Sequence, residues 1–239
     1  MQRPRAAFVA AALALAACSQ QEVRTFPGYA QAQYVHVAAP LSGNLARLNV
    51  RRGERVRSGQ TLFSLQVEEE ARALREAQAR VKAAQAQLRA ARRGAQEAPM
   101  RGAEAELNAA KAALAQAQWR LELKTAKAPR DGVVVETAYT VGEWVEAGLA
   151  VIAILAPQDI KVRFLVPSHV AAALHHGQGV RLRCPGCGEV SAEIAYVSPL
   201  AEPATEGQGA QRLHFLVEAR PAPEAALRLH PGQPVEVVL

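Results

Sequence analysis

One turn-rich phrase occurs twice in this chain of 239 residues, as GERVRSG from Gly53 to Gly59 and as GEWVEAG from Gly142 to Gly148. The likeness extends over residues 42–65 and 131–155, where alternating apolar runs such as LARLNV and VVVETAYTV are typical of short β-strands. Three glycines keep their spacing, so that Gly43, Gly53 and Gly59 match Gly132, Gly142 and Gly148. We expect all six to occupy turn positions with positive φ, which side chains disfavour. The sequence therefore predicts two copies of one small β unit.

The segment between the two copies has a helical pattern. Residues 67–93 contain no glycine or proline, a break follows at Gly94, and Pro99 suits the first turn of a second helix. Apolar residues recur every seven positions, at Val67, Leu74, Val81 and Leu88 and then at Met100, Leu107, Leu114 and Leu121, with alanines three positions after most of them. This pattern predicts an antiparallel coiled-coil hairpin, about 40 Å long at 1.5 Å per residue.

The first eighteen residues, MQRPRAAFVAAALALAAC, have the features of an export signal. Arg3 and Arg5 precede an apolar run over residues 6–17, which is too short to cross a bilayer but suits a secretory signal. Leu15 to Cys18 resembles the bacterial lipobox, in which cleavage leaves a lipidated cysteine. We therefore expect lipidation of Cys18; a soluble exported protein with a chance cysteine is the alternative.

The composition argues against several functional classes. The formal charge is +6, but basic residues are scattered among glutamates and only 5% of the residues are aromatic. Nucleic-acid binding favours clustered basic residues with interleaved aromatics, so we expect no nucleic-acid partner. No nucleotide-binding loop, nucleophile motif or carboxylate pair is evident, and the six histidines form no recognisable ligand set. We predict a protein that is not an enzyme, with no cofactor and no metal site.

The remaining cysteines, Cys184 and Cys187, stand in the sequence RCPGCGE. A thioredoxin-type motif would begin a helix, whereas the following GEVSAEIAYV alternates like a strand. A zinc site needs four ligands, and no second pair completes it. We favour a disulfide that closes a Pro-Gly turn, with modest stabilisation because so short a loop removes little chain entropy.

Each copy of the repeated phrase resembles one half of a biotinyl/lipoyl-type sandwich domain. In carrier proteins of this fold a lysine between the halves is modified, whereas residues 42–65 and 131–155 contain no lysine. A split sandwich with an inserted helical hairpin, behind a lipobox, is similar to the membrane fusion proteins, or periplasmic adaptors, of the HlyD-like family. Strand-like runs follow Pro157, with L-H-x-G-Q-x-V at Leu174–Val180 and Leu229–Val235, and resemble the β-barrel of those adaptors.

The resemblance implies a mainly β fold with an inserted antiparallel α-helical coiled-coil hairpin, in which a split biotinyl/lipoyl-like sandwich is followed by a C-terminal β-barrel. The expected segments are a signal peptide (1–17), a tether (18–34), the two halves of the lipoyl-like domain (35–66 and 127–156), the hairpin (67–126) and the barrel (157–239).

The resemblance also implies partners. An adaptor connects an inner-membrane transporter to an outer-membrane channel, self-associates into a ring, and here would hold the lipid bilayer through its anchor. The short hairpin, the CxxC turn and an end at PVEVVL resemble the short adaptors of ABC exporters, so an ABC-type transporter is expected. The hairpin tip carries Arg92, Arg93 and Arg101, which are candidates for contact with the channel; a purely solvated tip is the alternative.

Other functions stay open on the sequence alone. One alternative is an adaptor of a proton-driven, RND-type pump, and another is a lipoprotein scaffold without transport. We expect a periplasmic location at the inner membrane, although Ser19 after the lipidated cysteine leaves the outer membrane open.

Overall fold

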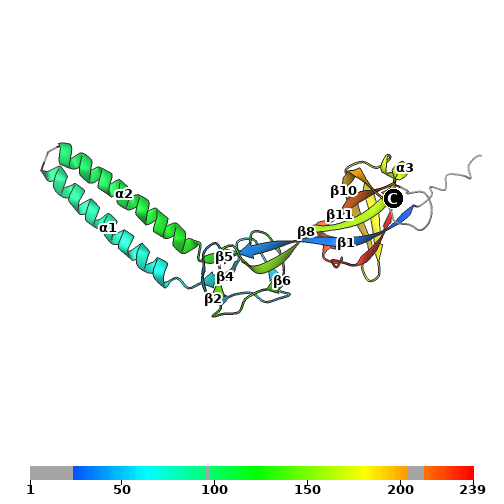
Figure 1. Ribbon diagram of the computed structural model, residues 1–239, viewed down its shortest axis with the longest axis horizontal. Coiled ribbons are helices and arrows are strands. Elements are labelled where there is room, and N and C mark those ends of the chain that lie inside the picture. The colour runs from blue at the N-terminus through cyan, green and yellow to red at the C-terminus, as the bar shows by residue number, and fades with distance from the viewer. Residues whose placement is uncertain (1–23, 95–96, 204–212) are drawn as a thin grey trace, which may run out of the picture. The chain divides into compact units, whose positions relative to one another are not determined.

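The computed structural model describes residues 24–94, 97–203 and 213–239, so the predicted lipidation site Cys18 lies outside the described residues. The chain is mainly β with two long helices (Figure 1). It divides into two compact units. We call Ala32–Asp159 the central unit, and Ile160–Leu239 together with the described residues before Ala32 the C-terminal unit. In the part of the chain that is described, no helix is both long enough and apolar enough to cross a membrane.

The β part of the central unit is a sandwich built from the two copies of the repeat. Its strands are the second part of β1 (Thr25–Ala38), β2 (Gly43–Leu48), β3 (Arg55–Val56), β4 (Thr61–Leu65), β5 (Thr125–Lys127), β6 (Gly132–Thr137), β7 (Trp144–Val145) and the first part of β8 (Ala150–Pro167). One sheet contains β8, β6 and β3 in this order, and the other contains β5, β4, β2 and β7. Equivalent strands of the two copies show the same sequence of buried and exposed positions.

The core of the sandwich draws on both copies. Leu45 and Phe63 from the first copy and Val134 and Ile154 from the second belong to one buried cluster. Alternation along each strand directs every second side chain to this core. Neither copy can bury its apolar face without the other, so the two copies form one domain although the helices separate them in the chain.

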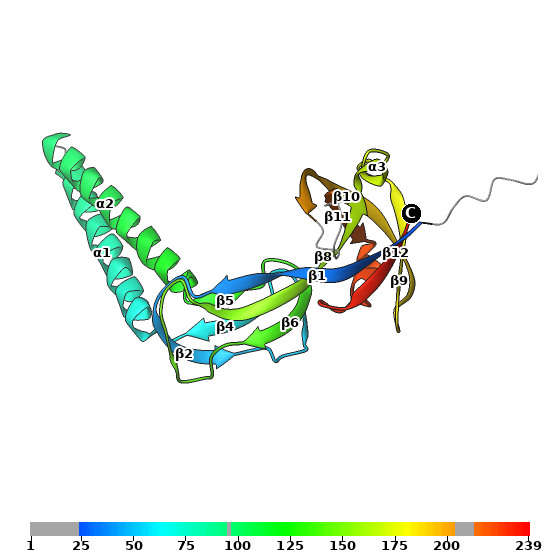
Figure 2. The same cartoon turned by 45° about the vertical axis from the view of Figure 1, so that its right-hand side comes forward.

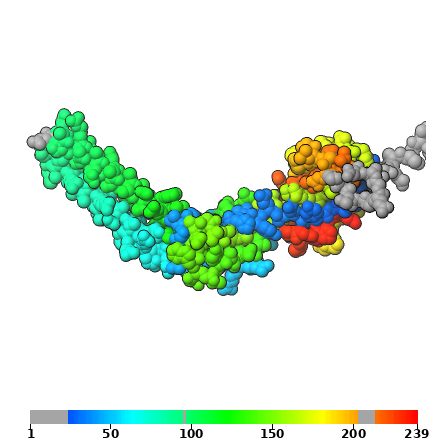
Figure 3. All heavy atoms as spheres, viewed as in Figure 1, coloured from blue at the N-terminus to red at the C-terminus, as the bar shows by residue number. Residues whose placement is uncertain are grey.

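The two helices are α1 (Glu68–Arg93) and α2 (Glu97–Glu122), which pack side by side (Figures 1 and 3). Val81, Ala84 and Ala110 form a small buried cluster, against which Leu107 and Leu114 pack. Every heptad position that the sequence singles out is buried or half-buried, whereas most other helix positions are exposed. The seam is therefore thin, and alanine on both sides allows a close approach of the helices.

The C-terminal unit combines the start of β1 and the end of β8 with α3 (Ser168–Ala171), β9 (Gly179–Cys184), β10 (Gly188–Pro203), β11 (Leu213–Pro221), α4 (Pro223–Ala226) and β12 (Pro234–Val238). Neighbouring strands follow the order β1, β12, β9, β10, β11, β8. Phe164, Leu182 and Ile194 are among its fully buried side chains.

The structure differs from the predicted tether over residues 18–34. Residues 25–34 form most of β1, and Thr25–Tyr29 pair with β12. Gly28 permits this strand to pass close to β8, because a Cβ there would lie 2.7 Å from the carbonyl oxygen of Arg163. The pairing partner is at the far end of the sequence, so the local pattern does not reveal it.

A charged triad crosses β8 and β11 in the C-terminal unit. The Lys161 amine donates to both carboxylate oxygens of Glu218, at 2.8 and 2.9 Å, and Nε of Arg163 donates to Oε1 at 2.8 Å. Burial works to raise the pKa of Glu218, but the hydrogen bonds from Lys161 and Arg163 outweigh it and hold this pKa below its usual value. Glu218 therefore stabilises the folded state in its ionised form.

We expect Glu218→Gln to lower the free energy of unfolding by about 2 kcal/mol at neutral pH, because it leaves two half-buried cations without their carboxylate. A depressed folded pKa gives stability that is present above the unfolded pKa, about 4.3, and is lost as the pH falls through the folded value. The variant should therefore lose less stability than the parent between neutral and strongly acidic pH.

Urea unfolding as a function of pH measures this difference. Glu189→Gln is the matched control, because Glu189 only forms exposed pairs with Arg181 and Arg183 at 3.4 and 3.5 Å, which contribute little. If the free energy of unfolding of the Glu218→Gln variant fell with pH as much as that of the parent, ionised Glu218 would not be the source of this acid sensitivity.

Candidate functional site

In the central unit, the turn of each copy forms backbone hydrogen bonds with a strand of the other copy. Gly53 N–H donates to the Val134 carbonyl at 2.7 Å, and Val134 N–H donates to the backbone carbonyl of Glu54 at 2.9 Å. The second copy forms the equivalent pair of bonds. Gly142 N–H donates to the Leu45 carbonyl at 2.8 Å, and Leu45 N–H donates to the carbonyl of Glu143 at 2.8 Å. Because β2 and β6 run in opposite directions, the turns that follow them lie at opposite ends of the sandwich (Figure 2).

The glutamate of the G-E-x-V phrase closes each turn. The carboxylate of Glu54 accepts the Arg51 N–H at 3.0 Å, and that of Glu143 accepts the Thr140 N–H at 2.9 Å. The bond from the Thr140 backbone holds the pKa of Glu143 below its usual value. The repeated glutamate is therefore explained by local turn structure and not by chemistry on a substrate.

Four of the six repeated glycines occupy the left-handed region, as predicted: Gly53, Gly59, Gly142 and Gly148 have φ between 81° and 97°. The prediction is wrong for Gly43 and Gly132, which begin strands and have no positive φ. These two positions need the absence of a side chain. A Cβ on Gly132 would lie 2.6 Å from Ile154 Cγ2, and one on Gly43 would lie 3.2 Å from the amine of Lys124.

Lys124 is the buried charged residue of the described chain, with an exposure of 7%. Its amine forms an ion pair with Glu70 of α1 at 2.9 Å and donates to the Ser42 carbonyl at 3.0 Å. The Ser42 hydroxyl also accepts a hydrogen bond, at 3.1 Å, from the N–H of Ala147 in the second copy of the repeated phrase. Lys124 thus ties both helices to the sandwich, and its buried, bonded amine is unlike the exposed lysine that a carrier domain presents for modification.

Comparison with known families bears directly on this arrangement. The family model of the CzcB-like barrel-sandwich hybrid domain matches residues 33–156, which is more than half of the chain. The chain belongs to this family. The matched range includes both copies of the repeat and the helices between them. No curated protein sequence matches the chain significantly.

Solved structures share the fold beyond the barrel-sandwich hybrid domain. A membrane fusion protein from Streptococcus pneumoniae R6 is 21% identical, with a TM-score of 0.69 over 90% of this chain and 98% of that one. A MacA-MexA chimeric protein with the Pseudomonas aeruginosa MexA α-hairpin domain is 21% identical, with a TM-score of 0.71 over 90% and 80%. MacA from Actinobacillus actinomycetemcomitans is 18% identical, with a TM-score of 0.61 over 91% and 78%.

The two copies of the repeated phrase differ in the side chains that they expose. Val141, Trp144 and Leu149, in and beside the phrase of the second copy, are 59%, 60% and 45% exposed. The equivalent positions of the first copy carry Arg52, Arg55 and Gln60. Since the same backbone accepts polar residues in the first copy, the fold does not require apolar side chains in the second. They are therefore available for contacts with a partner.

The predicted tip arginines lie where α1 ends and α2 begins. Arg92 pairs across the helices with Glu104 at 3.5 Å, while Arg93 and Arg101 are exposed. The structure thus brings all three to the same end of the helical pair and engages one of them internally.

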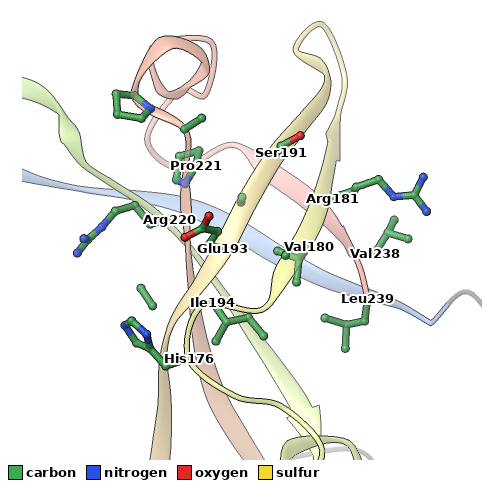
Figure 4. A pocket seen from close by; sticks show the side chains of 15 residues that line it. His176, Val180, Arg181, Ser191, Glu193, Ile194, Arg220, Pro221, Val238 and Leu239 are labelled. Atoms are coloured by element: carbon green, nitrogen blue, oxygen red, sulfur yellow. The ribbon is translucent and has the colours of Figure 1, made fainter.

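The structure joins Cys184 and Cys187 in a disulfide, with Cα atoms 5.4 Å apart, at the turn between β9 and β10. Gln233 Nε2 donates to the Pro185 carbonyl of this turn at 2.8 Å. A groove of about 620 Å³ lies in the same unit, lined by β9, β10, the end of β11, the start of α4 and the chain end (Figure 4). The side chains of Arg181 and Arg220 at its rim point in opposite directions, so they do not converge on one ligand.

Proposed function

We propose that this protein is a periplasmic adaptor of the membrane fusion type, with a HlyD-like architecture. It connects an ABC-type exporter of the inner membrane to a channel of the outer membrane. The observation that carries the proposal is the split sandwich. Its two half-domains are joined by backbone hydrogen bonds, and together they hold the base of the helical pair. The helical pair occupies the place where a carrier domain would present its lysine.

The other parts of the chain support this function. A lipid on Cys18 would anchor the protein, and the arginines at the helical tip would contact the channel. Several copies would form a ring around the passage. The protein catalyses nothing in this role; the transporter supplies the energy, and the adaptor supplies a continuous path across the periplasm.

The test is recovery of partners from the native membrane. The tagged full chain is extracted in mild detergent after crosslinking, and the captured proteins are identified by mass spectrometry. We expect an ABC permease with its ATPase, together with an outer-membrane channel. A proton-driven pump in their place would assign the adaptor to that class, and the absence of any transporter would favour a scaffold without transport.

One variant tests the tip in the same experiment. Replacing Arg92, Arg93 and Arg101 by Glu should abolish recovery of the channel and leave recovery of the transporter unchanged. Equal recovery of the channel by the variant would show that the tip is merely solvated. Intact mass after delipidation provides a further control, because a carrier protein would show a covalent increment on a lysine.

A further inference from the structure

Trp119 is the one aromatic residue of α1 and α2, and it is 58% exposed. Its neighbours Ala117 and Leu121, two positions away on either side, are half-buried seam residues. Two residues turn an α-helix by about 200°, so the indole points away from α1. Tryptophan is enriched among the residues that dominate protein interfaces. Its position on the outer face of α2 therefore needs an explanation other than the packing of the helical pair.

The outer face of α1 is defined by the same argument. Ala79 lies two positions from both Ala77 and Val81, which are buried against α2. Arg72 precedes Ala79 by seven positions and Arg75 precedes it by four, so all three share one face of the helix. All three are exposed. This face offers a small residue next to two guanidinium groups.

The two outer faces lie at the same level of the helical pair. A shallow groove between the helices is lined by Ala73, Glu76, Ala77 and Arg80 of α1 and by Ala113, Gln116, Ala117 and Arg120 of α2. Ala73 is therefore level with Arg120, and Trp119 is level with Arg72 and Arg75. Copies standing side by side at one height would bring Trp119 of one copy against these arginines of the next.

The charges of the two helices complement each other. Helix α1 carries seven basic residues (Arg72, Arg75, Arg80, Lys82, Arg89, Arg92 and Arg93) against four acidic ones (Glu68, Glu69, Glu70 and Glu76), a net charge of +3. Helix α2 carries three basic residues (Arg101, Lys111 and Arg120) against four acidic ones (Glu97, Glu104, Glu106 and Glu122), a net charge of −1. Two copies meeting through the same helix would be less favourable than α2 of one copy meeting α1 of another.

We propose that Trp119 anchors the contact between copies of this chain, with its indole against Arg72 and Arg75 on the outer face of α1 of the next copy. A guanidinium group over an indole adds cation–π attraction to the burial of the ring. The contact joins two different surfaces, and such head-to-tail contacts generate rings when the rotation between copies closes. That the copies form a ring is part of the proposed function, on which this inference rests; the inference adds the surfaces through which neighbouring copies meet.

The fluorescence of Trp119 reports on this contact directly. The chain has two tryptophans, so Trp144→Phe leaves Trp119 as the single source of tryptophan emission. We expect the emission of the full chain in detergent to move to shorter wavelength, and acrylamide quenching to fall severalfold, over the concentration range in which sedimentation shows assembly. Unchanged emission and quenching across that range would overturn the proposal.

Variants of both surfaces give a second readout. Trp119→Ala should weaken self-association at least tenfold, whereas Gln118→Ala, at an exposed position on another side of α2, should leave it unchanged. The pair Arg72→Glu and Arg75→Glu should weaken it similarly, while the equal charge change at Arg51→Glu and Arg52→Glu should not. Unchanged self-association of the Trp119→Ala variant, or a parent chain that stays monomeric, would overturn this inference. Recovery of a transporter decides the proposed function separately.

Discussion

Lys124→Met is expected to lower the free energy of unfolding of the central unit by about 3 kcal/mol, because it leaves Glu70 without its partner at a largely buried site. The side chains of Lys124 and Glu70 are only 8% and 15% exposed, and the pair joins α1 to the end of α2. Trp119 and Trp144 both belong to this unit. Tryptophan fluorescence during urea unfolding of the full chain therefore follows its transition.

Two further variants sharpen this measurement. Lys127→Met removes a lysine that is exposed in β5, and its effect should stay within about 0.5 kcal/mol. Glu70→Gln should be destabilising like Lys124→Met, and the double variant should lose less than the sum of the two, as expected for residues in direct contact. Strict additivity would show that the ion pair does not hold the helices to the sandwich.

Gly132→Ala is expected to destabilise the central unit by about 3 kcal/mol, at the upper end of the usual effect of overpacking. The added Cβ would lie 2.6 Å from both Ile154 Cγ2 and the Leu155 carbonyl oxygen, and the second of these atoms belongs to the backbone of β8. The equivalent Gly43→Ala is the matched control. Its Cβ would meet first the amine of Lys124, at 3.2 Å, and a side-chain atom can shift more easily than the backbone, so we expect a loss of about 1 kcal/mol.

Denaturation midpoints of both variants, again followed by tryptophan fluorescence, test this difference. Equal losses at Gly132 and Gly43 would contradict close approach to the backbone of β8 as the reason for Gly132. A much larger loss at Gly132 would instead support close approach of two strands as the reason for that glycine.

The sequence predicts those parts of the molecule whose physical cause is local. A seven-residue apolar period identifies the seam of the helices, because each heptad position returns to the same side of a helix whatever it packs against. Gly53, Gly59, Gly142 and Gly148 are likewise predictable, since a tight turn needs a residue that tolerates positive φ. These two signals and their order along the chain carry the resemblance to membrane fusion proteins, and that resemblance implies the mainly β fold.

Other features depend on partners that the chain brings together only on folding. Nothing near Lys124 in the sequence indicates that its amine is buried between Glu70 and Ser42. The pairing of residues 25–29 with the last strand has no local signal either. Among the candidate functional residues, exposure singles out Trp119 and Trp144. Sequence periodicity gives the face on which each side chain lies, whereas the tertiary structure decides which faces are covered, because burial depends on contacts between residues far apart in the chain.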